Sequence, residues 1–167
     1  MKLIPILLIF NIILLSCKKD KVSGGETVEI YLLKTSQTVP GKCQIDAAAS
    51  SIQDTPEITN DDILEYSQIA REFKLSAIAI QKVKAFHDFT PFAVTVDRKV
   101  IYYGFFKPGI SSSSCTNSIT MDISLSSGNK IVLRLGYPAA IDDAGFDDQR
   151  NNSWLLGTLE KQGKLRP

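Results

Sequence analysis

Two pairs of alternating segments constrain the fold of this chain more than any other feature of its 167 residues. In each pair, apolar residues alternate with small or polar residues, a short polar link follows, and the alternation resumes. Such alternation is typical of strands with one buried face, and short links between them predict hairpins. The pairs are 92–96 with 100–106, and 119–125 with 131–135. We therefore expect two antiparallel hairpins in one sheet.

Shorter elements surround these hairpins. Residues 28–33 alternate like a strand, and residues 63–66 and 72–75 have the length and composition of two more. Residues 35–51 are rich in small and polar side chains and predict a long excursion from the sheet.

Two helices are predicted from capping residues and apolar faces. Ser76 and Asn152 are candidate N-caps, because their side-chain oxygens can accept a backbone N–H, although residues 75–80 also fit a strand. The second helix ends at Gly163. The apolar faces consist of Ile80, Val83 and Phe86 in the first helix, and of Leu155, Leu156 and Leu159 in the second. The predicted fold class is α+β: an antiparallel sheet of about five or six strands, with two helices packed on one face.

The first sixteen residues have the layout of a secretory signal peptide. A basic start at Lys2 precedes an apolar run over residues 3–15 and a small residue, Ser16. The run is shorter than the roughly 20 apolar residues of a transmembrane helix. We expect residues 1–16 to be removed, which leaves Cys17 at the start of the mature chain.

The sequence Leu14-Leu15-Ser16-Cys17 resembles the lipobox of bacterial lipoproteins. The resemblance implies acyl chains, palmitate among them, on Cys17, and these would anchor the protein to a membrane. Residues 17–27 then form the lipidated cysteine and a flexible tether, and residues 28–167 a single α+β domain. Lysines rather than an aspartate follow Cys17, which implies the outer membrane, facing the periplasm. The alternative is an ordinary signal peptide with a chance cysteine beside it.

The two remaining cysteines, Cys43 and Cys115, form an even pair in a chain predicted to be exported. Such pairs are usually oxidised outside the cytosol. We therefore predict a disulfide, and the chain-entropy estimate for so long a loop is roughly 4 kcal/mol. The alternative is two separate buried thiols.

Composition excludes several functions and disfavours others. Without Lys2 the chain has 18 basic and 18 acidic residues, and a neutral chain without a basic stripe argues against binding nucleic acid. The single histidine, His87, makes an ordinary metal site improbable. We predict no metal, no cofactor and no catalytic residue. The acidic residues Asp142, Asp143, Asp147 and Asp148 are the weak candidates for calcium binding or hydrolysis.

Four aromatic residues in one predicted strand form the candidate binding surface: Tyr102, Tyr103, Phe105 and Phe106. Because side chains alternate along a strand, both of its faces carry rings. One face packs on the core. The other is either covered by the excursion at 35–51 or open to a protein partner, since exposed aromatic patches often mark binding sites.

The middle third of the chain resembles a known domain. Residues 58–63 (Ile-Thr-Asn-Asp-Asp-Ile), 72–76 (Glu-Phe-Lys-Leu-Ser) and 92–101 (Phe-Ala-Val-Thr-Val-Asp-Arg-Lys-Val-Ile) are similar in order to the head subdomain of the first periplasmic domain of SecD, a subunit of the bacterial protein-export machinery. Arg98 stands where that family has glycine. The leader, the cysteine pair and residues 151–165 also resemble small uncharacterised envelope lipoproteins. The resemblance implies a fold more than an activity.

These observations favour a non-enzymatic, lipid-anchored envelope protein that binds or scaffolds a protein partner, by strand addition or ring packing. The first alternative is an inhibitor or immunity-type lipoprotein that inserts a rigid loop, Lys107–Ser114, into an envelope enzyme. Two further alternatives are a hydrolase built around Asp142–Asp148 and a small-ligand binder.

Overall fold

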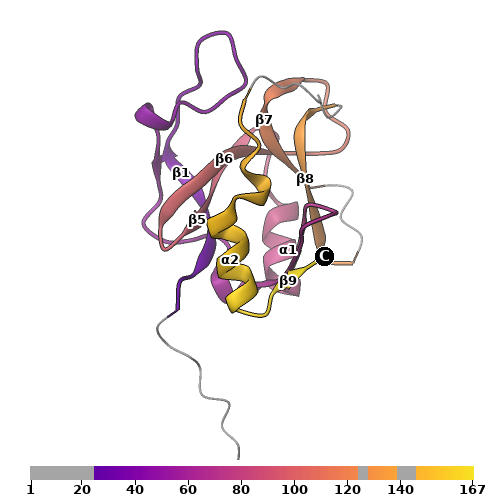
Figure 1. Ribbon diagram of the computed structural model, residues 1–167. Helices are drawn as coiled ribbons and strands as arrows, with labels where there is room; N and C mark the ends of the chain where they lie inside the picture. Colours follow the sequence, from indigo (N-terminus) through magenta and orange to yellow (C-terminus); the bar gives the residue numbers. More distant parts are fainter. Residues whose placement is uncertain (1–24, 124–127, 139–145) are drawn as a thin grey trace, which may run out of the picture.

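The computed structural model describes residues 25–123, 128–138 and 146–167 (Figure 1). In these ranges the structure has nine strands and two α-helices, which confirms the α+β class. The strands are β1 Val28–Thr35, β2 Ser51–Ile52, β3 Ile63–Ser67, β4 Glu72–Leu75, β5 Thr90–Val96, β6 Lys99–Lys107, β7 Cys115–Asp122, β8 Lys130–Tyr137 and β9 Leu165–Arg166. The helices are α1 Ala77–Lys84 and α2 Ser153–Lys161, with short 3₁₀-helices at Ala47–Ala49, Asn60–Asp62 and Gln149–Asn151.

The sheet is mixed and larger than the sequence predicted. Its strand order is β2-β1-β5-β6-β7-β8-β4-β3-β9, and two pairs, β6 with β7 and β3 with β9, run parallel. The prediction of five or six antiparallel strands therefore understated the number of strands and missed these two parallel pairs. Residues 108–118 carry the chain back before β7 pairs with β6, so that Gly104 lies opposite Ile119 in parallel register. Strands of two residues, such as β9, were missed because they are too short to show the alternation of apolar and polar residues from which strands are predicted.

Both helices begin at the predicted caps. The Ser76 hydroxyl accepts the N–H of Ala79 at 3.1 Å, and the Asn152 side chain accepts the N–H of Trp154 at 2.9 Å. Gly163 follows α2 with φ of +70°, a conformation that favours glycine. The helical prediction after Ser76 is thus confirmed, and the competing strand is limited to β4.

Side chains on the two faces of β6 belong to different apolar clusters. Tyr102 and Phe106 join the main core together with the buried faces of α1 and α2. Tyr103 and Phe105 face a second, smaller cluster on the other side. Between them, Gly104 leaves room for its neighbours: a Cβ there would lie 2.4 Å from the Ile119 carbonyl oxygen and 2.5 Å from the Phe92 ring.

Among the helices of the described ranges, none combines the length and the apolar character that crossing a membrane requires.

Candidate functional site

The aromatic residues predicted as a binding surface are covered from within the chain. Tyr102 and Phe105 are each 5% exposed, Phe106 is fully buried and Tyr103 is half-buried. Ile45 from the excursion closes the second cluster over Phe105. Of the two alternatives for the second face of the strand, the covered one therefore holds, and Tyr102, Phe105 and Phe106 form no open binding surface. The physical reason is that the excursion supplies the apolar side chains that exclude water from this face.

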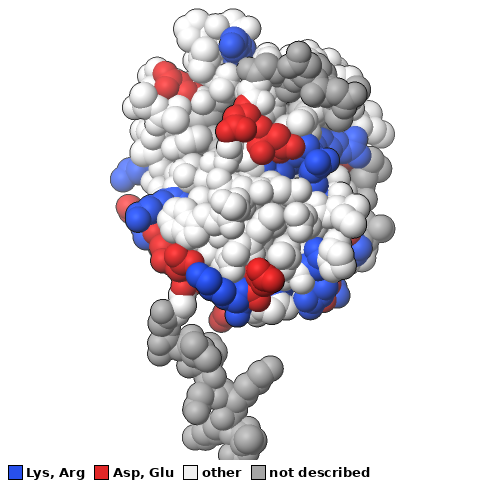
Figure 2. Space-filling model, viewed as in Figure 1, with Lys and Arg blue, Asp and Glu red and all other residues white. Residues whose placement is uncertain are grey.

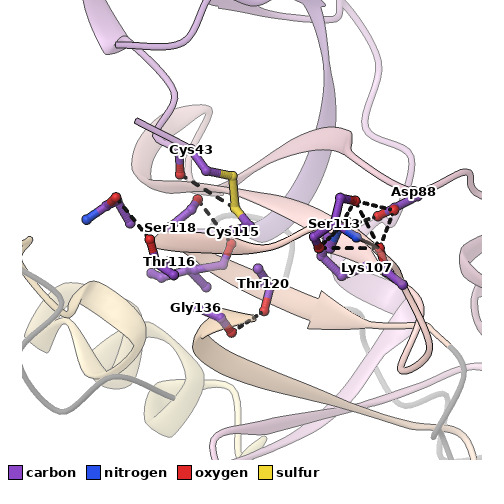
Figure 3. The surroundings of a disulfide bond; sticks show 12 residues. Cys43, Asp88, Lys107, Ser113, Cys115, Thr116, Ser118, Thr120 and Gly136 are labelled. Atoms are coloured by element: carbon purple, nitrogen blue, oxygen red, sulfur yellow. Dashed lines mark hydrogen bonds and ion pairs between the residues drawn. A yellow bond between two sulfur atoms is a disulfide. The ribbon is translucent and has the colours of Figure 1, made fainter. Parts of the chain in front are cut away.

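The disulfide predicted between Cys43 and Cys115 is present, with the two Cα atoms 5.1 Å apart (Figure 3). It joins the excursion to the first residue of β7. Residues 108–114, which we call the pinned loop, end directly before this residue. The disulfide therefore holds both the excursion and the end of the pinned loop.

A buried lysine holds the beginning of the same loop. Only 1% of the Lys107 side chain is exposed, and its Nζ lies 2.7 Å from Oδ1 of Asp88. The ammonium also donates to Oγ of Ser111 at 3.0 Å, and to the carbonyl oxygen and Oγ of Ser113 at 3.1 and 3.2 Å (Figure 3). The carboxylate in turn accepts from the Ser111 hydroxyl at 2.6 Å. Each polar group of the cluster thus has a partner inside it.

Two aromatic rings enclose the ammonium of Lys107. Nζ lies 3.6 Å from the centroid of the Phe89 ring and 4.9 Å from that of Tyr137. Ring faces carry negative charge density, and a desolvated cation–ring contact can contribute about 2 kcal/mol. The rings therefore replace part of the water that burial removes from the ammonium.

The charges and hydrogen bonds of this cluster connect its members to one another. Burial alone raises the pKa of Asp88, but the hydrogen bonds from Lys107, Ser111 and Ser113 outweigh it and hold that pKa below its ordinary value. Asp88 is thus a charged partner of Lys107, and the Ser111 hydroxyl is engaged by both.

The hydroxyl of Tyr137 fixes the tip of the pinned loop. It accepts a hydrogen bond from the N–H of Ser111 at 2.6 Å. It donates to the carbonyl oxygens of Gly109 and Ser111, each at 3.2 Å. The residue between them, Ile110, is 93% exposed. The tip therefore holds an apolar side chain in water on a backbone that is tied down on both sides. Such preorganisation reduces the entropy lost on binding.

The acidic candidates are only partly within the described ranges. Asp142 and Asp143 lie outside them, as does the predicted lipidation site, Cys17. Asp148 pairs with the buried Arg150 at 2.7 Å, and this bond outweighs burial and lowers the pKa of Asp148. Within the residues that the structure describes, no group of three His, Cys, Asp or Glu side chains is placed to hold a metal ion.

The edges of the sheet offer little backbone to an added strand. The outermost strands, β2 and β9, have two residues each. On the side of β1 away from β5, β2 pairs with the second half of β1, and Ile30 in the first half exchanges backbone hydrogen bonds with Ile58. Short, covered edges of this kind protect a sheet against pairing with another chain.

Sequence reasoning named the loop but missed the residues that fix it: Lys107, Asp88 and Tyr137. One signal was available. Positions 103, 105 and 107 share one face of β6, so Lys107 follows two aromatic residues onto a face that the excursion covers. The contacts come from the turn before β5, which holds Asp88, and from the end of β8, which holds Tyr137, and such distant segments leave no local pattern.

Comparison with known proteins finds no matching family model, no matching curated protein and no matching solved structure.

Proposed function

We propose that this protein is a non-enzymatic, lipid-anchored protein of the cell envelope that binds a protein partner through the pinned loop. The observation that carries the proposal is the 93% exposure of Ile110 between two backbone groups held by Tyr137. An exposed apolar anchor on a fixed backbone is the kind of side chain that fills a pocket at the centre of an interface. It replaces the aromatic strand as the candidate binding surface.

Anchoring through Cys17 rests on the signal-peptide layout and the lipobox resemblance of residues 14–17. The Cys43–Cys115 disulfide supports export, because disulfides persist in oxidising compartments such as the periplasm. Radiolabelled palmitate should enter the wild-type chain and not a Cys17→Ser variant, and the label should fractionate with the outer membrane. A fold related to the SecD head is part of the same proposal, and the order strand, strand, helix, hairpin over residues 63–107 supports it.

Partner binding is tested by site-specific photo-crosslinking in living cells. A photoreactive amino acid at position 110 should give one discrete adduct. The same group at Ile69, which is 81% exposed in a different turn, is the matched control and should not. Co-expressed soluble Cys17→Ser chain should compete the adduct away, and the same chain with Ile110→Ser should not. Equal adducts at both positions, or equal competition by both chains, would count against the loop as the binding surface.

Inhibition of an envelope enzyme is the second candidate function. The observation that favours it is the fixation of the loop at three places: the Lys107 cluster, the Tyr137 hydroxyl and the Cys115 disulfide. A rigid loop can occupy a cleft without rearranging. If the partner crosslinked at position 110 is a hydrolase, its activity should fall on adding the wild-type chain and recover with Ile110→Ser. A crosslinked partner without enzymatic activity would contradict inhibition and support partner binding as the only function of the loop.

A further inference from the structure

The pinned loop lies at one end of β6. The tether joins the domain at the other end. Glu26 is the last but one residue before β1, and its carboxylate accepts the Trp154 indole N–H at 2.9 Å and the Thr158 hydroxyl at 2.9 Å. Lys99, the first residue of β6, lies with its Nζ 5.5 Å from the Trp154 ring. The tether therefore meets the domain beside the start of β6.

A second contact confirms this position. The N–H of Thr27 donates to Oδ1 of Asp97 at 2.8 Å, and Asp97 lies in the turn between β5 and β6. The pinned loop begins after Lys107, at the other end of β6, where Asp88 precedes β5. A strand of nine residues spans about 25 Å. In Figure 1 the described chain likewise begins at the lower end of the domain, and the excursion after β1 reaches the upper end.

The chemistry of the loop restricts what it can meet. Its seven residues, Pro108-Gly109-Ile110-Ser111-Ser112-Ser113-Ser114, carry no charge. On the face that Figure 2 shows, positive and negative side chains are interspersed around the lower end of the domain. Neither feature suits attraction to anionic lipid headgroups, which requires clustered Lys or Arg.

We propose that the domain stands on its membrane with the tether end down and the pinned loop directed away, so that Ile110 enters an uncharged apolar pocket of a soluble protein in the aqueous compartment. This inference rests on the proposed lipid anchor at Cys17. Nine peptide units separate Cys17 from Glu26, and they reach at most about 30 Å. With the tether end facing the membrane, the loop lies about 25 Å from the lipid surface when the tether is collapsed and about 55 Å when it is fully extended.

The single tryptophan of the chain provides the test. Trp154 marks the tether end, and Ile110→Trp combined with Trp154→Phe moves the only indole to the loop. The wild-type chain and this double variant, both lipidated, are added to preformed vesicles of phosphatidylethanolamine and phosphatidylglycerol. The vesicles contain dansyl-labelled phosphatidylethanolamine. Energy transfer to the dansyl group should be several-fold weaker from position 110 than from Trp154. Soluble Cys17→Ser versions of both proteins are the controls and should show no transfer.

Equal or stronger transfer from position 110 would overturn the proposed orientation. Because Trp154→Phe removes a hydrogen bond to Glu26, the single variant Ile110→Trp gives a second measurement: its mean transfer should fall below that of the wild-type chain. Intact mass of the same samples reports acylation, so failure of the lipid anchor is seen separately. Binding that depends on the loop should also be insensitive to salt, whereas a strong salt dependence would contradict an uncharged pocket.

Discussion

Nζ of Lys107 lies 2.7 Å from Oδ1 of Asp88, yet the lysine side chain is 1% exposed and the carboxylate side chain 33% exposed. The two partners of this ion pair therefore depend on each other unequally. The carboxylate reaches water, but the ammonium relies on the protein for its solvation. An ion left buried without its partner is costlier than one that remains hydrated.

This asymmetry predicts that Asp88→Asn is more harmful than Lys107→Met. The first variant leaves the buried ammonium without its charged partner and should lower the free energy of unfolding by about 3 kcal/mol. The second keeps the packing of the lysine stem and removes the ammonium with its ion pair, hydrogen bonds and ring contacts. Because the desolvation cost of the buried ammonium disappears as well, the net loss should be only about 1–2 kcal/mol. Urea unfolding of the oxidised mature chain measures both. The double variant should be more stable than Asp88→Asn alone; the reverse order would contradict a buried charge that needs Asp88.

The same pair predicts how stability depends on acid. The folded-state pKa of Asp88 is lowered, so its contribution is present above the unfolded value, near 3.8, and is lost as pH falls through the folded pKa. Asp88→Asn should therefore flatten the fall in stability below about pH 4. Ser111→Ala removes one donor to Asp88 and should give an intermediate slope. Unfolding at fixed urea as a function of pH measures these slopes, and an unchanged slope in Asp88→Asn would oppose the assignment.

Local patterns predicted the elements well because caps and periodicity act within a few residues. Ser76 and Asn152 cap the predicted helices, and the alternating segments became β5, β6, β7 and β8. Strand direction could not be read in the same way, because a period of two is the same in parallel and antiparallel pairs. The parallel pairing of β6 with β7 thus depends on the path of residues 108–118.

The candidate site was harder to predict, for a related reason. Lys107 is buried because two distant segments neutralise and cover it: Asp88 and Phe89 before β5, and Tyr137 in β8. Sequence alone treats a lysine at a strand end as exposed. The loop itself was recognisable from its serines and from Cys115, whereas the exposure of Ile110 required the fold.

A buried hydroxyl without a partner predicts a stabilising substitution. Within the described ranges, the hydroxyl of Tyr102 has no hydrogen-bond partner, and burial raises the pKa of Tyr102 well above its ordinary value. Tyr102→Phe should therefore raise the free energy of unfolding by up to about 1 kcal/mol. The matched control is Tyr66→Phe, because the Tyr66 hydroxyl donates to the Arg150 carbonyl oxygen at 2.7 Å. That variant should lose about 1 kcal/mol. Equal losses in both would mean that Tyr102 also has a partner.

Two glycines predict opposite effects of one added methyl group. A Cβ at Gly104 would lie 2.4 Å from the Ile119 carbonyl oxygen, which the parallel β6–β7 pairing fixes in place. Gly104→Ala should therefore cost about 1–3 kcal/mol through overpacking. Gly157, inside α2, would place its Cβ with nothing within 4 Å, so Gly157→Ala should stabilise by about 0.5–1 kcal/mol through helix propensity.

Thermal unfolding of the two alanine variants at matched concentration provides the comparison. A neutral Gly104→Ala would contradict this close contact with Ile119, because the methyl group can be admitted only if β6 and β7 move apart, and that movement costs stability. Because β7 begins at Cys115 and β6 ends at Lys107, such displacement would also loosen the pinned loop. The contact between Gly104 and Ile119 thus supports the loop that presents Ile110, and Gly104→Ala should weaken photo-crosslinking at position 110, while Gly157→Ala leaves it unchanged.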